Sequence, residues 1–219
     1  MKKVLFSLLS LSLCSSILCM NDTPAFASAN TDDNFEIINL PPERWQEFKE
    51  LRLQAVEEAP VSIGVTRDDE QARSEDAYAK FLEKSAGGEF TWSIFAQRNN
   101  KLIGMAGAMC TKSHLSTMRH VATVISVYTK PEFRRMGIAT ALMKALLTKL
   151  EKSNVMQAQL QVTINPANDN DQTAIKVYQR LGFKQCGTYS NDIVVNGKSY
   201  SSVIMERGIE EKPIPEKTN

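Results

Sequence analysis

The feature that most constrains the fold is the run 121–128, which is almost wholly apolar on both of its alternating faces. A strand with this pattern is expected in the middle of a sheet, where other layers cover both of its sides. Residues 138–150 follow with apolar side chains at helical spacing and with lysines outside. That pattern is typical of an amphipathic helix packed on a sheet. Together the two segments predict an α/β fold.

Other strands and helices are predicted from similar patterns. Strand candidates occupy 35–40, 90–97, 101–111, 160–164, 183–188 and 200–206, with tight turns at Asn99–Asn100 and at 195–198. One helix is expected to end at about Glu58, and another runs through Leu82 and ends at Gly87–Gly88. A further helix is expected over 174–181, where Gly182 suits a left-handed C-terminal cap and Phe183 can fold its ring back onto the helix. The polar, acidic segment 61–74 is predicted to be a loop. Within it, Asp68–Asp69–Glu70 either forms a solvated turn or attracts a cationic acceptor substrate.

Length and charge limit the class of protein. The chain has 219 residues, of which 42% are hydrophobic, enough for one domain with a full core. Its net charge of +1 has no long blocks of one sign, which argues against nucleic acid or an acidic membrane surface as a partner. We predict one domain over 35–206 and an unstructured tail over 207–219.

The first 29 residues have the pattern of a signal peptide, with a basic start, an apolar run and a small-residue stretch. Cleavage is expected after Ala27 or Ala29, which would make the mature protein secreted or periplasmic with no membrane segment. The run is short for a permanent span, which needs about 20 apolar residues. The alternative is translation from Met20, which would give a cytoplasmic protein.

The cysteines predict neither a disulfide nor a metal site. Two of the four lie in the leader, so Cys110 and Cys186 remain, and we expect them to be separate and mostly buried thiols. With His114 and His120 they show no metal-ligand spacing.

The turn after the apolar strand has the composition of a phosphate site. Pro131 and the pair Arg134–Arg135 lead to Gly137, which opens the amphipathic helix. Free N–H groups at a helix start attract anions, and a glycine lets a phosphate approach the backbone. Arginines add charge and hydrogen-bond donors. The spacing is common by chance, so an ordinary helix start with solvated arginines remains the alternative.

Three stretches resemble one family. Residues 127–139 are similar to the acyl-CoA signature of the GNAT superfamily, in which a strand, a proline and an Arg/Gln-x-x-Gly-x-Gly/Ala turn follow each other. Residues 174–183 resemble that family's closing helix with its Tyr-x-x-x-Gly-Phe ending, and 51–60 resemble its first helix and substrate loop. The resemblance spans 35–206 in the right order.

The resemblance implies a mixed α+β sheet of about seven strands with about four helices, splayed between its fourth and fifth strands. Acetyl-CoA would lie in the gap, with no metal involved. Val127 and Thr129 would pair with the pantetheine arm, and the pyrophosphate would be held by Arg134, Arg135, Met136, Gly137, Ile138, Ala139 and Thr140. Asp171 stands where the family commonly has an asparagine, so Asn170 is the candidate contact there.

The same resemblance implies N-acetyl transfer to the primary amine of a small molecule or peptide, by direct attack in a ternary complex, in a monomer or homodimer. Tyr178 would stabilise the leaving thiolate, and a backbone N–H near Val127 would bind the oxyanion. No general base is evident, since the fourth strand carries no carboxylate and His120 lies at its far end. Deprotonation at pH 7 costs about 4.6 kcal/mol for a lysine-like amine but about 1.4 for an α-amine, which favours the latter.

Two other functions remain open. The missing base is compatible with a non-catalytic acyl-CoA-binding module. The leader is compatible with an exported acetyltransferase that modifies a partner protein.

Overall fold

A computed structural model describes residues 35–166 and 170–209, which form a seven-stranded sheet in the order β1-β2-β3-β4-β5-β7-β6. Adjacent strands are antiparallel except β4 and β5, which are parallel. The mixed sheet is therefore confirmed. The strands are β1 (Glu36–Ile38), β2 (Thr91–Arg98), β3 (Lys101–Met109), β4 (Val121–Thr129), β5 (Gln157–Ile164), β6 (Lys184–Val195) and β7 (Lys198–Gly208).

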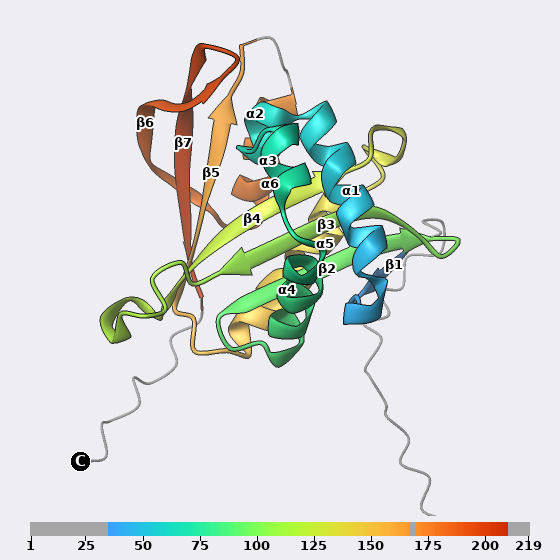
Figure 1. The fold of residues 1–219 in the computed structure, drawn as a ribbon. Coiled ribbons are helices and arrows are strands. Elements are labelled where there is room, and N and C mark those ends of the chain that lie inside the picture. Colours follow the sequence, from blue (N-terminus) through green and yellow to red (C-terminus); the bar gives the residue numbers. More distant parts are fainter. Residues whose placement is uncertain (1–34, 167–169, 210–219) are drawn as a thin grey trace, which may run out of the picture.

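Helices cover both faces of the sheet (Figure 1). The four predicted helices are present: α1 (Trp45–Glu58) and α4 (Glu75–Gly87) lie on one face, and α5 (Ile138–Glu151) and α6 (Asn170–Arg180) on the other. Three short 3-10 turns accompany them: η1 (Pro42–Arg44), η2 (Ser116–Met118) and η3 (Pro131–Phe133).

The segment 61–74 is not the loop that its polar composition suggested. It contributes to two short helices, α2 (Pro60–Ile63) and α3 (Arg67–Ala72). Pro60 starts α2 at a position where its missing N–H costs nothing. Thr66 starts α3 through a capping box, in which its hydroxyl and the Asp69 carboxylate each accept the other residue's backbone N–H. The acidic residues therefore begin a helix.

The core consists of two apolar layers, one on each side of the sheet. Alternation along β2 divides its side chains between them: Trp92 and Ile94 pack with α5, and Phe95 packs with α1 and α4. Both faces of β4 contribute as well, through Val124 on one side and Tyr128 on the other. The central, doubly covered strand predicted from 121–128 is confirmed.

The sheet opens between β4 and β5. These strands pair only where Val121–Thr123 lies beside Gln157–Gln159, and β5 then follows β7 along its whole length. In Figure 1, β5, β6 and β7 accordingly stand apart from β2, β3 and β4, and the two groups fan out from a common end. The splay implied by the family resemblance is present.

The C-terminal hairpin is longer than predicted. β6 and β7 meet at Asn196 and Gly197, whose φ angles of 50° and 74° suit the two-residue turn. β7 continues to Gly208, and Ile209 is buried, so the folded domain extends past residue 206. Because β6 is an edge strand, Cys186 on it is exposed, contrary to our expectation, whereas Cys110 is buried; both thiols are free.

The predicted leader lies outside the described residues, as does the tail beyond residue 209. Within the described part, no helix has both the length and the apolar character needed to cross a membrane.

Leu146 provides a test of the core. It is fully buried on α5 against the sheet. Leu146→Ala should lower the free energy of unfolding by about 2–5 kcal/mol, because it removes apolar contacts and leaves a cavity. Lys144→Ala, at an exposed position on the same helix, is the matched control. Urea unfolding measures both, and equal stability of the two variants would contradict the packing.

Candidate functional site

A pocket of about 670 Å³ lies at the open end of the splayed sheet. One wall comes from the end of α1 and from α2, and the opposite wall comes from α6. The C-terminal half of β4 and the loop between β4 and α5 form the base. The pocket lining includes most of the residues that the sequence singled out, namely Val127, Thr129, Arg134, Arg135, Gly137, Ile138, Ala139, Thr140 and Tyr178. Folding therefore brings the two resembling motifs, 127–139 and 174–183, to one cavity.

The β4–α5 loop has the geometry of an anion site. Gly137 is the N-cap of α5 with a φ of 80°, and as a glycine it offers no side chain to the helix N–H groups. A Cβ built on Gly137 would meet no atom within 4 Å, so the backbone there faces open space. Ala139 and Thr140 of the first turn lie on the pocket wall. Uncapped N–H groups at the positive end of a helix dipole suit a phosphate.

The two arginines of the loop have different surroundings. Arg134 is tied to the protein: its Nε donates to the Thr129 carbonyl at 3.1 Å, and its Nη2 lies 3.4 Å from the Glu58 carboxylate. Arg135 is exposed and has a φ of 66°, so its own backbone helps to turn the loop. Arg134 thus fixes the loop to the end of β4, and the exposed Arg135 places a positive charge at the edge of the pocket.

The edge of β4 that faces the pocket is unpaired. Among the described residues, no strand pairs with this side of β4 beyond Thr123. Val127 and Thr129 lie in this stretch and line the pocket. An unpaired edge can hydrogen-bond an extended ligand that carries amide groups, as an added strand would. The Thr129 hydroxyl is buried and has no hydrogen-bond partner in the described part of the chain.

Tyr178 projects from α6 into the pocket lining and is 9% exposed. Its ring packs edge-on against Phe183 at a centroid distance of 6.0 Å, and the Phe183 N–H returns to the Tyr178 carbonyl. Gly182 permits this reversal with a φ of 87°, as the sequence predicted. Burial raises the pKa of Tyr178, which keeps the phenol protonated at neutral pH. Within residues 35–166 and 170–209, no hydrogen bond to the Tyr178 hydroxyl is seen.

The remaining predicted contacts fall into two groups. Met136 packs its side chain against the core, so only its backbone belongs to the loop. The side chain of Asn170 lies outside the described residues. Its neighbour Asp171 is buried, and Oδ2 accepts the Asn165 N–H at 2.7 Å. Burial raises the pKa of Asp171, and this hydrogen bond opposes the rise.

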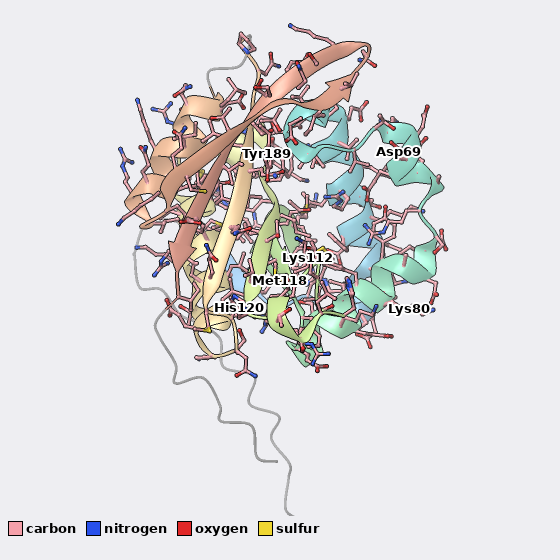
Figure 2. The ribbon with its side chains drawn as sticks, turned by 90° about the vertical axis from the view of Figure 1, so that its left-hand side faces the viewer. Asp69, Lys80, Lys112, Met118, His120 and Tyr189 are labelled. Atoms are coloured by element: carbon pink, nitrogen blue, oxygen red, sulfur yellow. The ribbon has the colours of Figure 1, made fainter. Side chains whose placement is uncertain are left out.

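His120 does not belong to the site. It directly precedes β4, whereas the pocket lies at the other end of that strand. Figure 2 shows His120 beside Met118 toward one end of the sheet and Tyr189 of β6 toward the opposite end.

Sequence reasoning missed Glu58, the last residue of α1, which lines the pocket. Its Oε2 accepts a hydrogen bond from the Tyr128 hydroxyl at 2.8 Å, and Arg134 approaches the same oxygen. Burial, followed by this bond to Glu58, raises the pKa of Tyr128. These three residues come from α1, β4 and the β4–α5 loop, so no local pattern could have associated them.

A buried polar cluster behind β4 was missed as well. Arg52 of α1 donates to both oxygens of Glu70 at 3.1 and 2.6 Å, and its Nη1 donates to Ser126 Oγ at 2.7 Å. Tyr78 donates to Glu70 at 2.7 Å. Glu70 and Arg52 are 2% and 6% exposed. The acidic stretch 68–70 is therefore neither a solvated turn throughout nor a free attraction for a substrate, because Glu70 is an internal ion-pair partner.

Comparison with known proteins shows the family. The model of the acetyltransferase (GNAT) family matches residues 45–183, and the chain belongs to that family. No curated protein sequence matches the chain.

Solved structures of similar fold are described as acetyltransferases. An acetyltransferase of the GNAT family from Streptococcus pneumoniae is 18% identical with a TM-score of 0.68, over 80% of this chain and 99% of that one. A phosphinothricin acetyltransferase from Sinorhizobium meliloti in complex with acetyl-CoA is 19% identical with a TM-score of 0.66, over 81% and 89%. A ribosomal-protein-alanine N-acetyltransferase from Brucella melitensis is 19% identical, also at 0.66, over 78% and 98%. At these identities the likeness establishes the fold.

The described residues contain no group of His, Cys, Asp and Glu side chains suited to hold a metal ion.

The Arg52–Glu70 pair predicts a pH-dependent contribution to stability. Burial alone would raise the pKa of Glu70, but hydrogen bonds and charge from Arg52, with help from Tyr78 and Arg73, hold it below its ordinary value. A lowered folded-state pKa stabilises the protein above the unfolded pKa of about 4.3, and the contribution is lost as the pH falls through the folded value. Glu70→Gln should therefore cost about 3–5 kcal/mol at pH 7, because Arg52 is left buried and uncompensated.

Urea unfolding at a series of pH values measures this effect, and the difference from wild type should shrink below about pH 4. Glu47→Gln is the control, since Glu47 pairs with Arg44 at 2.7 Å at a half-exposed site and should contribute below about 1 kcal/mol. A difference for Glu70→Gln that stays constant with pH would contradict the assignment.

Proposed function

We propose that the protein is an N-acetyltransferase that moves an acetyl group from acetyl-CoA to a primary amine by direct attack in a ternary complex. The observation that carries the proposal is the convergence of three features on one pocket: the unpaired edge of β4, the uncapped start of α5 at Gly137, and the phenol of Tyr178. Membership of the acetyltransferase (GNAT) family supports the same reaction class. The similar phosphinothricin acetyltransferase was solved with acetyl-CoA.

The pocket residues fit acetyl-CoA by their chemistry. The backbone at Val127 and Thr129 offers hydrogen bonds to the amides of the pantetheine arm. The first turn of α5, with the exposed Arg135 beside it, suits the pyrophosphate. Met136 contributes backbone to the loop, and Ile138, Ala139 and Thr140 form the first turn of α5. Acetyl-CoA would then run along β4 toward Tyr178.

Acetyl transfer makes one bond and breaks one. The amine nitrogen uses its lone pair to attack the thioester carbonyl carbon, a C–N bond forms, and the C–S bond breaks. Sulfur leaves as a thiolate, and the nitrogen loses a proton to solvent or to a nearby base. An N–H near Val127 would stabilise charge on the carbonyl oxygen.

Tyr178 is assigned to the leaving group. Its raised pKa keeps the hydroxyl protonated, so it can donate a hydrogen bond to the thiolate as charge develops. Full proton transfer is less favourable, because an ordinary phenol of pKa about 10 is already a weaker acid than a thiol of about 8.5, and burial widens the gap. Tyr178 therefore acts as a donor to sulfur.

The acceptor is an α-amine or another amine of low pKa. Glu58 lines the pocket at the end of α1, and its carboxylate is already engaged, since Gln54 and Tyr128 donate hydrogen bonds to it and Arg134 approaches it. An α-amine needs only about 1.4 kcal/mol for deprotonation at pH 7, within reach of a weak base or a water chain. A lysine-like amine would need about 4.6 kcal/mol.

The activity test is coenzyme A release from acetyl-CoA across a panel of α-amino amides, free peptides and polyamines. We expect turnover with α-amines that rises from pH 6 to 8, as the acceptor loses its proton. Tyr178→Phe should lower kcat about ten- to a hundredfold and leave the Kd for acetyl-CoA near its wild-type value, because the lost bond forms as sulfur departs. Binding without turnover, unchanged by Tyr178→Phe, would instead support the acyl-CoA-binding module.

The binding site is tested at Gly137. Gly137→Val puts a branched side chain on the backbone that the pyrophosphate must approach, and binding of acetyl-CoA by calorimetry should be lost. Gly197→Val is a matched control, because Gly197 also has a positive φ, 74° against 80°, and also faces open space. The control carries the same backbone strain in a distant hairpin. Normal acetyl-CoA binding by a folded Gly137→Val protein would refute the assignment.

A further inference from the structure

Helix α1 holds β4 by polar contacts on both sides of Val127. Ser126 Oγ accepts a hydrogen bond from Arg52 at 2.7 Å, and the Tyr128 hydroxyl donates to Glu58 at 2.8 Å. Arg52 and Glu58 both belong to α1. The residue between the two contacts is therefore fixed in place from a single helix.

β4 is irregular at this point. Met105 of β3 lies opposite Tyr128, and Gly107 lies opposite Ile125, so one residue of β3 faces two of β4. Ser126 has a φ of 57°, a left-handed conformation that a serine adopts only where its surroundings impose it. Such bulges change the direction of the backbone and of the following side chain. The hydrogen bond from Arg52 falls on the residue with the unfavourable φ.

Arg52 has little freedom of its own. Both Glu70 oxygens accept from its guanidinium, and Glu70 also accepts from the Tyr78 hydroxyl at 2.7 Å. Arg73 approaches Glu70 at 3.9 Å from the other side. Buried ion pairs add little net stability but can specify one arrangement of the groups around them. Here that arrangement includes the bulge.

We propose that Arg52, held by Glu70, is a positioning residue that fixes the bulge at Ser126 and so the backbone at Val127. The inference rests on the proposed function, in which that backbone stabilises the oxyanion. Arg52 does not line the pocket, so it acts through Ser126. Its loss should reduce kcat while acetyl-CoA still binds, because the α5 loop is untouched.

Ser126 provides the mildest test. Ser126→Ala and Ser126→Gly both remove the oxygen that Arg52 binds, and the glycine also removes the backbone strain. With acetyl-CoA and L-alaninamide, both variants should lower kcat about tenfold, within the loss that a small misplacement of reacting groups causes. The Kd for acetyl-CoA should change less than kcat, because Thr129 and the α5 loop still hold the donor. Ser116→Ala, at an exposed site in η2, should match wild type. If both Ser126 variants keep wild-type kcat, the proposal is wrong.

A double-mutant cycle separates positioning from stability. Arg52→Lys keeps the charge beside Glu70 but loses the fork that reaches Ser126. If Arg52 acts through Ser126, Arg52→Lys should lower kcat in the wild-type background and change it little in Ser126→Ala. Independent, multiplying losses would contradict the proposed route.

Amide hydrogen exchange tests the same contact without any turnover. Ser126→Ala should speed exchange about tenfold at the β3–β4 amides that flank the bulge, in the pairs Met105–Tyr128 and Gly107–Ile125, and leave the α5 amides unchanged. Unchanged exchange on both sides of the bulge would overturn the proposal even if the enzyme were active. A wild-type protein that releases no coenzyme A with any amine would refute the proposed function, and the exchange result would still decide whether Arg52 fixes the bulge at Ser126.

Discussion

The structure depends on the early end of the pairing between β4 and β5. A strand in the middle of a sheet normally satisfies its backbone groups on both sides, and β4 does so only as far as Thr123. Past that point the two strands separate, and α2 and α6 line the opening between them. The unpaired groups of β4 are thereby exposed inside a cavity. One departure from regular pairing thus creates both the room for a ligand and the backbone that could bind it.

α1 connects the two halves of this arrangement. Its apolar side packs Phe48 and Leu51 into the core, and its polar side reaches β4 through Arg52 and Glu58. Glu58 further meets Arg134, whose Nε is bonded to the Thr129 carbonyl. The end of α1, the end of β4 and the β4–α5 loop are therefore linked through contacts of Glu58 and Arg134.

What the sequence could predict was local. The apolar run 121–128, the stripe of α5 and the turns at Asn99–Asn100 and Asn196–Gly197 each follow from neighbours in the chain, and all are present. The family resemblance implied a role for Tyr178 at the thioester sulfur, and the structure places Tyr178 in the same pocket as the β4–α5 loop. The contacts of Arg52 could not be predicted, because it lies 18 residues from Glu70 and 74 residues from Ser126 in the chain. Cys186 was misplaced for a similar reason, since its exposure depends on β6 being the last strand of the sheet.

Two glycines near the pocket are retained by different demands. A Cβ on Gly104 would stand 3.0 Å from the Tyr128 carbonyl oxygen and 3.1 Å from Leu142, so the packed interior itself requires a glycine there. A Cβ on Gly137 would touch no protein atom, and Arg135 already bears a positive φ in the same loop. A genetic selection for folding alone would therefore act on Gly104 through steric clash and on Gly137 only through the strain of its positive φ. A selection for activity should add a further demand at Gly137 alone, so comparing the two selections would separate the demand of packing from that of the open loop.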